Sequence, residues 1–193
     1  MNFYSDDIIN DIIDNEPLDS IADKIDKLYD NTERIMFYYS YRTISMMYTG
    51  RLLRHKQTRF AFYCIDTEFN IANCPSCLIY CKQFDKTKNE VAYYILMICT
   101  RPIFKKLGYA SMLLNGFIER VKIENKKYPD RTIKIVVSSL DTAVTYYEKY
   151  GFRWTKKSIL EYPVLLCFEK YEEDKEYFIL ELNVNESILV NQL

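Results

Sequence analysis

The segment from Val91 to Gly151 constrains the fold most, because it alternates twice between strand-like and helical patterns. The runs Val91 to Thr100 and Thr132 to Ser138 are rich in β-branched and aromatic residues, as buried strands are. Between them, apolar residues recur at helical spacing at Ala110, Leu113, Leu114, Phe117 and Val121. A second helix is expected to end near Tyr150. A strand, a helix and another strand in this order predict a parallel crossover.

Further strands are expected on both sides of this unit. Phe60 to Ile65 and Leu78 to Phe84 are strand-like runs that, with Val91 to Thr100, form an antiparallel meander, and a last strand is expected at Tyr177 to Val184. The stretch Ile159 to Phe168 is apolar but shows no clear period. The prediction is one α+β domain built on a mixed, mostly antiparallel central sheet with a β-α-β crossover.

The first sixty residues are mostly helical in character. Two short amphipathic helices are expected, one carrying Ile8, Ile9, Ile12 and Ile13 and one carrying Leu18, Ile21, Ile25 and Leu28. The stretch from Ile35 to Arg54 fits either a buried helix or a strand near Ile35 to Tyr41. We divide the chain into a helical segment 1–58, a core 59–184 and a loose tail 185–193.

Composition excludes several classes of function. The chain has 193 residues and a formal net charge of −1, so no global basic field points to nucleic acid as a partner. No apolar stretch approaches the ~20 residues of a membrane-spanning helix. With a single histidine, His55, a three-histidine metal site is impossible. Six cysteines without a signal peptide predict free thiols in a reducing compartment, with the cytoplasm as the default.

Gly108 has the most informative local context, because glycine is scarce in this chain. A strand ends near Thr100, Pro102 forbids its continuation, and Gly108-Tyr109-Ala110-Ser111 opens directly into a helix. Such a turn presents backbone N–H groups, backed by the helix dipole, to a phosphate or diphosphate. Lys105, Lys106 and Arg101 can add positive charge. A plain helix start explains the same residues, so the anion site is one of two interpretations.

The second motif is Ala143-Val144-Thr145-Tyr146-Tyr147-Glu148-Lys149-Tyr150-Gly151-Phe152. Together, the two segments resemble the GCN5-related N-acetyltransferase (GNAT) superfamily, whose motifs are Gln/Arg-x-x-Gly-x-Gly/Ala and, later, Ala-x-x-x-Tyr-Glu-Lys-x-Gly-Phe. Lys105 replaces the usual Gln/Arg, whereas Gly108 and Ala110 match. Leu140 stands where the family usually has Asn, and we expect Ser139 or Asp141 to cap the second helix instead.

The resemblance implies a sheet with helices on both faces and acetyl-CoA as cosubstrate. The diphosphate would bind at Lys105, Lys106, Leu107, Gly108, Tyr109, Ala110 and Ser111. The pantetheine arm would pair with the backbone around Ile98, Cys99 and Thr100, where this strand diverges from the strand Thr132 to Ser138. The implied activity is direct acetyl transfer from acetyl-CoA to a primary amine of a protein, peptide or small molecule.

Tyr147 occupies the position of the general acid in the family motif. A phenol suits this role, because it stays protonated at neutral pH and can donate to the departing sulfur. The base is less defined: Glu90 is the candidate, with Asp66 and Glu68 as alternatives. Because Glu90 begins its strand and the Asn of the family is absent, a degenerate domain that only binds coenzyme A or a protein stays open as the alternative function.

The remaining features have ordinary explanations beside functional ones. Cys74 and Cys77 form a C-x-x-C motif, with Cys64 and Cys81 nearby in the sequence. These cysteines fit a zinc site, a redox dithiol or ordinary buried thiols. We prefer buried thiols and expect no metal. Cys99 is expected to be a buried strand residue and His55 a surface residue. The acidic residues of segment 1–50 either attract a cationic amine or solvate helices. We expect a monomer or homodimer with no nucleic acid or membrane partner.

Overall fold

The computed structural model describes residues 3–5, 35–40, 44–55, 57–66, 71–169, 171–173 and 175–185. The two helices expected between residues 8 and 28 lie outside these ranges, as does most of the predicted tail. None of the helices in the described ranges is long and apolar enough to cross a membrane.

The described strands form one seven-stranded sheet in the order β1-β2-β3-β4-β5-β7-β6. Their bounds are β1 Phe3–Ser5, β2 Thr58–Tyr63, β3 Ser76–Asp85, β4 Glu90–Thr100, β5 Thr132–Ser139, β6 Arg153–Trp154 and β7 Phe178–Asn183. Strands β4 and β5 pair in parallel, whereas β1–β2, β5–β7 and β6–β7 are antiparallel. The mixed sheet with its β4-α4-β5 crossover confirms the predicted fold class.

The helices are mostly short. They are η2 Met36–Ser40, α3 Met46–Arg54, η3 Ile71–Asn73, η4 Pro102–Phe104, α4 Tyr109–Lys127, η5 Asp141–Ala143, α5 Val144–Glu148, η6 Ile159–Glu161 and α6 Pro163–Leu166. In the undecided stretch, Met36–Ser40 and Met46–Arg54 are helical, so the strand interpretation near Ile35 is wrong. The aperiodic stretch from Ile159 to Phe168 contains two single-turn helices, which are too short to show a helical period.

The chain divides into two compact units, which we describe separately. The first contains residues 1–79 and 97–117. Its described core includes Tyr39, Leu52 and Leu78 together with Cys64, Cys74 and Cys77, all of them buried. The Tyr39 hydroxyl donates to the Cys74 carbonyl, and the Cys99 thiol donates to the Tyr39 carbonyl at 2.8 Å. These contacts tie η2 to the ends of β3 and β4.

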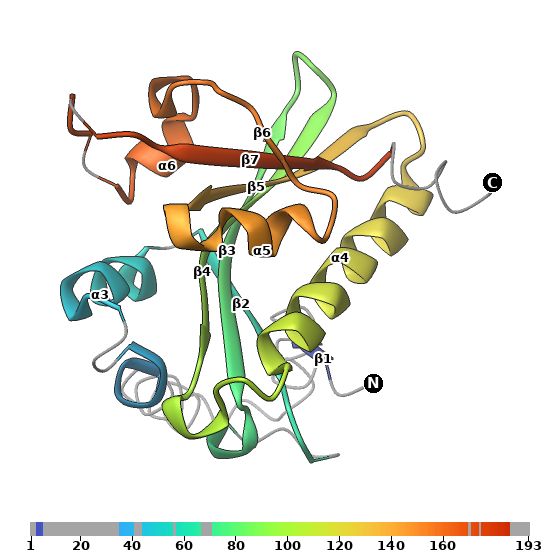
Figure 1. Ribbon diagram of the computed structural model, residues 1–193. Helices are drawn as coiled ribbons and strands as arrows, with labels where there is room; N and C mark the ends of the chain where they lie inside the picture. Colours follow the sequence, from blue (N-terminus) through green and yellow to red (C-terminus); the bar gives the residue numbers. More distant parts are fainter. Residues whose placement is uncertain are drawn as a thin grey trace, which may run out of the picture. The chain divides into compact units, whose positions relative to one another are not determined.

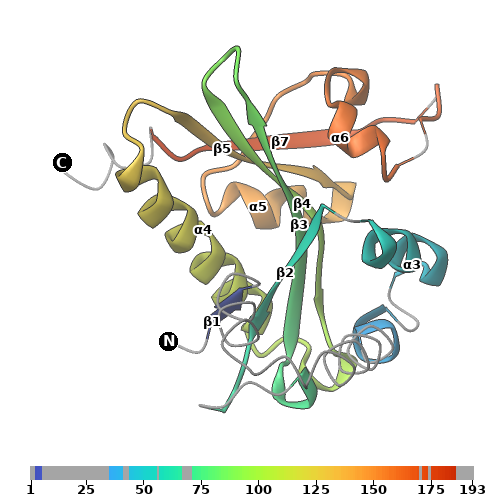
Figure 2. The same ribbon diagram turned by 180° about the vertical axis from the view of Figure 1, so that it is seen from behind.

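The second unit contains residues 80–96 and 118–193. Apolar side chains of β5 and β7, including Ile133, Ile135, Val137, Leu180 and Leu182, form its core. Helices α5 and α6 lie on opposite sides of β7 (Figures 1 and 2). The sheet of this unit is thus covered by a helix on each face.

Candidate functional site

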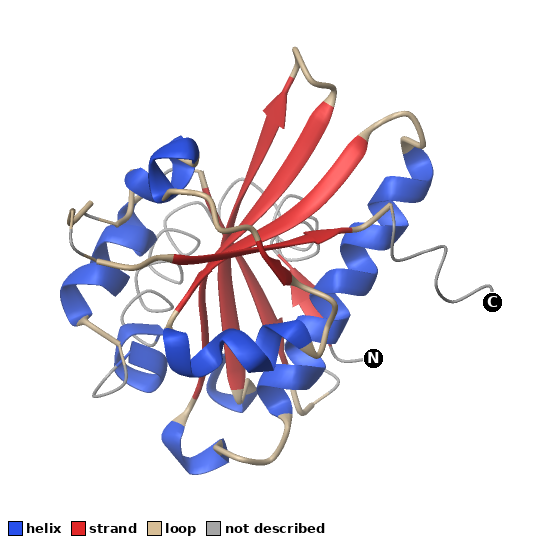
Figure 3. Cartoon of the chain, turned by 45° about the horizontal axis from the view of Figure 1, so that its top comes forward, coloured by secondary structure: helices blue, strands red, loops and turns tan. Residues whose placement is uncertain are grey.

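The segment Lys105–Ser111 follows β4 through the short helix η4 and enters α4 (Figures 1 and 3). Gly108 has a φ of 82°, in the left-handed region that glycine adopts most readily, and Lys106 has a φ of 66°. A Cβ atom built on Gly108 would have nothing within 4 Å. The backbone is therefore open on this side, and a ligand can approach it closely.

The backbone N–H groups of residues 106–111 are available to a ligand, whereas that of Lys105 is not. The N–H of Lys105 donates to the carbonyl of Pro102, and the N–H of Met112 donates to the carbonyl of Gly108. Among the described residues, none accepts a hydrogen bond from the N–H groups of residues 106–111. These include the first N–H groups of α4, for which the helix contains no carbonyl acceptor. The partial positive charge at this end of the helix favours binding of an anion.

Charge near the segment comes from Lys105 and Lys106, which are exposed and form no ion pair with a described residue. Arg101, in contrast, is engaged. Its guanidinium donates to the Ala72 carbonyl and stacks 4.2 Å from the ring centroid of Tyr38 and 5.3 Å from that of Phe104. Of the three basic residues expected to face a phosphate, Arg101 has a structural role in this arrangement.

The end of β4 carries the other predicted coenzyme residues. Parallel pairing with β5 runs from Glu90–Thr132 to Ile95–Val137, while β4 continues to Thr100. Ile98, Cys99 and Thr100 thus lie beyond the last β4–β5 pair. The Thr100 hydroxyl is 2.7 Å from that of Ser76, and the Cys99 side chain is buried, as predicted.

Tyr147 lies in α5 and is buried. Its ring packs edge-on against those of Tyr146 and Phe152, at centroid distances of 5.2 and 5.6 Å. Burial raises the pKa of Tyr147 above its ordinary value. No described residue forms a hydrogen bond with its hydroxyl group, so the Tyr147 Oη proton is available to a ligand.

Glu90, the candidate base, starts β4, at the opposite end of the strand from Thr100. Lys134 lies 3.0 Å from the Glu90 carboxylate and 3.3 Å from that of Glu181. Burial alone would lower the pKa of Lys134, but the hydrogen bond to Glu90 and the charge of Glu181 raise it. Glu90 thus belongs to an ion-pair cluster within the second unit.

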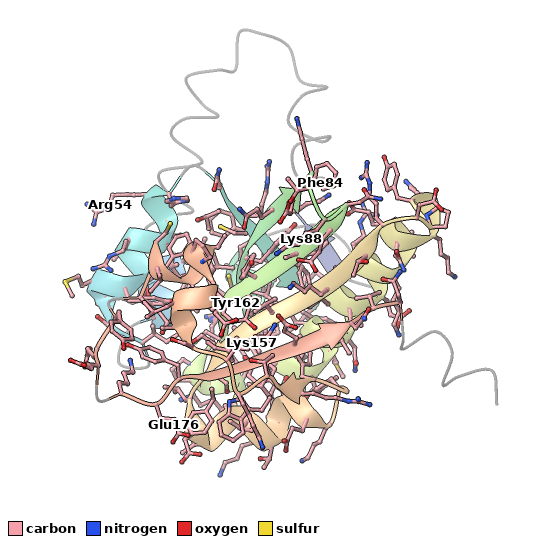
Figure 4. All side chains as sticks on the ribbon, turned by 90° about the horizontal axis from the view of Figure 1, so that it is seen from above. Arg54, Phe84, Lys88, Lys157, Tyr162 and Glu176 are labelled. Carbon is pink, nitrogen blue, oxygen red and sulfur yellow. The ribbon has the colours of Figure 1, made fainter. Side chains whose placement is uncertain are left out.

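The register between β5 and β7 shows on which face of the sheet each side chain of these strands lies. Ser138 pairs with Ile179, and Val136 pairs with Glu181, so these four side chains point to one face, together with Lys134. Tyr162, labelled in Figure 4, donates to the Glu181 carboxylate at 2.9 Å and therefore lies on this same face. We call it the Ser138 face.

The other face of β7 carries Leu180 and Leu182, because side chains alternate along a strand. Gly151, which ends the turn after α5, lies against Leu182: a Cβ on Gly151 would be 3.4 Å from the Leu182 Cδ1 atom. Helix α5 and Tyr147 thus belong to the Leu182 face.

The segment after α6 holds a carboxylate that the sequence did not indicate. Glu169 follows α6 directly, and its N–H donates to the Leu165 carbonyl at 2.8 Å. Burial raises the pKa of Glu169 above its ordinary value, although Ser138 and the charge of Lys175 act to lower it. Because Glu169 follows an aperiodic stretch, no sequence signal indicates it.

Other expectations at the site have clear outcomes. Neither Ser139 nor Asp141 caps the helix after β5: the Ser139 hydroxyl donates to the Leu140 carbonyl, and no side chain caps η5 or α5. Both cap predictions are wrong. Among the described residues, no group of three His, Cys, Asp or Glu could hold a metal ion. None of the six cysteines forms a disulfide bond, and Cys167 alone among them is exposed.

Comparison with known proteins relates this arrangement to a family. A family model described as an acetyltransferase (GNAT) domain matches residues 83–162. The fold resembles GCN5 of Tetrahymena, at 13% identity and a TM-score of 0.53 over 81% of this chain and 88% of that one. It also resembles smu.2055 of Streptococcus mutans UA159, at 15% identity and a TM-score of 0.50 over 81% and 95% of the two chains.

A third structure, the KacTA–DNA complex, has 13% identity and a TM-score of 0.50 over 79% of this chain and 85% of that one. At such identities the likeness establishes the fold alone. No curated protein matches the sequence. The matched segment begins in β3 and ends after η6, and it contains both the Lys105–Ser111 segment and Tyr147. Residues 83–162 are thus similar to an acetyltransferase (GNAT) domain, and the fold of the chain is similar to that of GCN5.

Proposed function

We propose that this protein transfers an acetyl group from acetyl-CoA directly to a primary amine. The observation that carries the proposal is the run of backbone N–H groups from Lys106 to Ser111 without acceptors among the described residues. The open side of Gly108 and the exposed ammonium groups of Lys105 and Lys106 fit a diphosphate at the same place. Acetyl-CoA would supply the diphosphate and, at its other end, an activated acetyl thioester.

The pantetheine arm is proposed to run along the end of β4. A strand that continues past its parallel partner offers backbone groups to an extended ligand, and the β4–β5 pairing ends at Ile95–Val137. Ile98, Cys99 and Thr100 are the residues proposed to face the arm. Because backbone groups make this contact, side-chain identity matters little there. A backbone N–H of the same strand is also proposed to stabilise the oxyanion formed on attack.

Tyr147 is proposed as the general acid. When the amine nitrogen forms its bond to the carbonyl carbon, the carbon–sulfur bond breaks and the electron pair stays on sulfur. A hydroxyl group that stays protonated can donate to this sulfur. Burial that raises the pKa of Tyr147 and the lack of a described partner for its hydroxyl both support this role.

Glu90 is less suited to be the base in this arrangement, because Lys134 already binds its carboxylate at the start of β4.

We also propose that residues 59–184 form the coenzyme-binding core and that segment 1–58 contributes to the acceptor side. The lack of disulfide bonds fits a reducing compartment such as the cytoplasm; the buried cysteines are Cys64, Cys74, Cys77, Cys81 and Cys99.

The test combines binding with turnover. Isothermal titration calorimetry measures acetyl-CoA binding, and thiol release is followed with a lysine-rich peptide, spermidine, glucosamine and kanamycin as acceptors. The proposal expects micromolar to submillimolar binding and turnover with at least one amine. Tyr147→Phe is expected to keep the affinity and lose most of the turnover. Binding without turnover on any amine would instead support the coenzyme-binding module, and no binding at millimolar concentration would refute both.

A further inference from the structure

Arg101 joins three segments of the first unit. It follows β4 directly, its N–H donates to the Pro75 carbonyl at 2.9 Å, and its carbonyl accepts from the Phe104 N–H at 2.9 Å. Its guanidinium donates to the Ala72 carbonyl, and its Cζ atom lies 4.2 Å from the ring centroid of Tyr38 and 5.3 Å from that of Phe104. One side chain therefore connects η2, η3 and η4.

The ring of Phe104 extends this contact into the segment that enters α4. Phe104 packs edge-on against Tyr109 at a centroid distance of 5.8 Å, and the Tyr109 ring lies 5.6 Å from that of Tyr63 in β2. Phe104 ends η4, and Tyr109 begins α4. The two rings thus hold the two ends of residues 105–108 together.

The backbone between these rings has a conformation that needs support. Lys106 has a φ of 66°, and Gly108 has a φ of 82°. Glycine adopts the left-handed region readily, whereas another residue keeps it only where its surroundings fix it. The side chains of Lys105, Lys106 and Leu107 are exposed, so their packing does not fix this conformation. The shape of the segment therefore depends on contacts at its two ends.

We propose that Arg101 is a positioning residue for acetyl-CoA, which acts through Phe104 and Tyr109 to hold residues 105–111 in the diphosphate-binding conformation before the ligand arrives. This proposal rests on the proposed function. Arg101 does not touch the ligand, because its guanidinium is engaged by a carbonyl and two rings. When only a fraction of the molecules has the competent conformation, Kd rises by the inverse of that fraction. Loss of Arg101 thus weakens binding without removing a ligand contact.

The alternative is that Arg101 binds a phosphate directly, and an uncharged neighbour separates the two roles. Phe104→Leu removes the ring that links Arg101 to Tyr109 but removes no charge. If Arg101 positions the segment, Arg101→Met and Phe104→Leu both weaken CoA binding, and the double variant loses less than the sum of the two because the residues act through one another. If Arg101 binds a phosphate, Arg101→Met alone weakens binding.

The second unit contains a matched control for this arrangement. The Cζ atom of Arg131 lies 4.8 Å from the ring centroid of Phe84, which is labelled in Figure 4, and 4.1 Å from that of Tyr128. Arg131 is therefore also a cation between two rings, but it lies outside the unit that contains the Lys105–Ser111 segment. Arg131→Met is expected to lower the Tm comparably to Arg101→Met and to keep the parental Kd for CoA.

The first experiment is calorimetric titration with CoA. Arg101→Met and Phe104→Leu are each expected to raise Kd about 5- to 30-fold, as expected for losing one cation–π contact or one hydrogen bond to a charged group. With an amine that turns over, KM for acetyl-CoA rises while kcat at saturation stays unchanged. A parental Kd in Arg101→Met overturns the proposal, whatever its Tm. A higher Kd in Arg101→Met with a parental Kd in Phe104→Leu also overturns it.

The second experiment needs no ligand. In the unliganded protein, ¹⁵N relaxation and relaxation dispersion report the motion of the amides of residues 106–108. This motion is expected to increase in Arg101→Met and Phe104→Leu and to stay unchanged in Arg131→Met. Unchanged motion in Arg101→Met overturns the proposal. If the parent does not bind CoA, the proposed function has failed, and the relaxation measurement alone decides whether Arg101 fixes the segment.

Discussion

Substitution of Gly108 by Ala separates the backbone role of this residue from its role in ligand binding. Gly108 has a φ of 82°, and an L-residue in the left-handed region costs about 1–2 kcal/mol. A chain of this length loses about 2–4 °C of Tm for each kcal/mol. We therefore expect a fall in Tm of about 2–8 °C. No clash adds to this cost, because nothing lies within 4 Å of the new Cβ.

The new methyl group occupies the open side on which the diphosphate is proposed to lie. Losing one hydrogen bond to a charged group costs about 1.5–3 kcal/mol, which corresponds to a Kd for CoA higher by about 10- to 100-fold. Gly151→Ala is the matched control. Gly151 has a φ of 88°, and its Cβ would meet only the side chain of Leu182, at 3.4 Å.

The assay compares chemical denaturation and calorimetric titration with CoA for the two variants. Both are expected to lose similar stability, whereas Gly108→Ala alone is expected to lose affinity. If the two variants keep the parental Kd while losing stability alike, the open side of Gly108 does not face the ligand, and the reasoning is refuted.

Three further variants follow from single contacts. Tyr147→Phe is expected to lower kcat at least tenfold at unchanged Kd for acetyl-CoA, and equal losses in the two quantities contradict its role as an acid. Burial alone would raise the pKa of Glu124, but hydrogen bonds from Lys82 of β3 and Tyr93 of β4 lower it. Glu124→Gln is therefore expected to lower the free energy of unfolding in urea by about 1 kcal/mol at pH 7, and by progressively less as the pH falls below ~4. A difference that does not depend on pH contradicts this. Lys134→Met leaves two carboxylates without their shared cation, so a Tm that falls at pH 8 and recovers at pH 4 is expected, and an unchanged Tm shows that the ion pairs contribute nothing.

The strands and the long helix could be predicted because their patterns are local and continuous. The runs that became β2 to β5 and β7 are rich in β-branched and aromatic residues, and the stripe from Ala110 to Val121 runs along α4. Strands β1 and β6 contain three and two residues, too few for any alternation to show. The helical cap was predicted incorrectly because the Ser139 hydroxyl turns to the Leu140 carbonyl instead.

Side-chain partnerships at the site depend on contacts that no local pattern contains. The stacking of Arg101 on Tyr38 and its hydrogen bond to Ala72 connect three separate segments of the chain. From the sequence alone, Arg101 was therefore as good a candidate for binding a phosphate as the neighbouring lysines. Lys134 meets both Glu90 and Glu181 only because β5 pairs with β4 on one side and with β7 on the other. Motif spacing, in contrast, indicated the Lys105–Ser111 segment and Tyr147 directly.

The central claim is that the backbone amides from Lys106 to Ser111 bind a diphosphate, and NMR titration of ¹⁵N-labelled protein with CoA tests it most directly. The amide signals of this segment are expected to shift downfield and saturate together, and 3′,5′-ADP should shift them as well, while pantetheine, which has no phosphate, leaves them in place. If CoA at millimolar concentration leaves these amides unshifted, or if pantetheine moves them as strongly as CoA does, the account is contradicted.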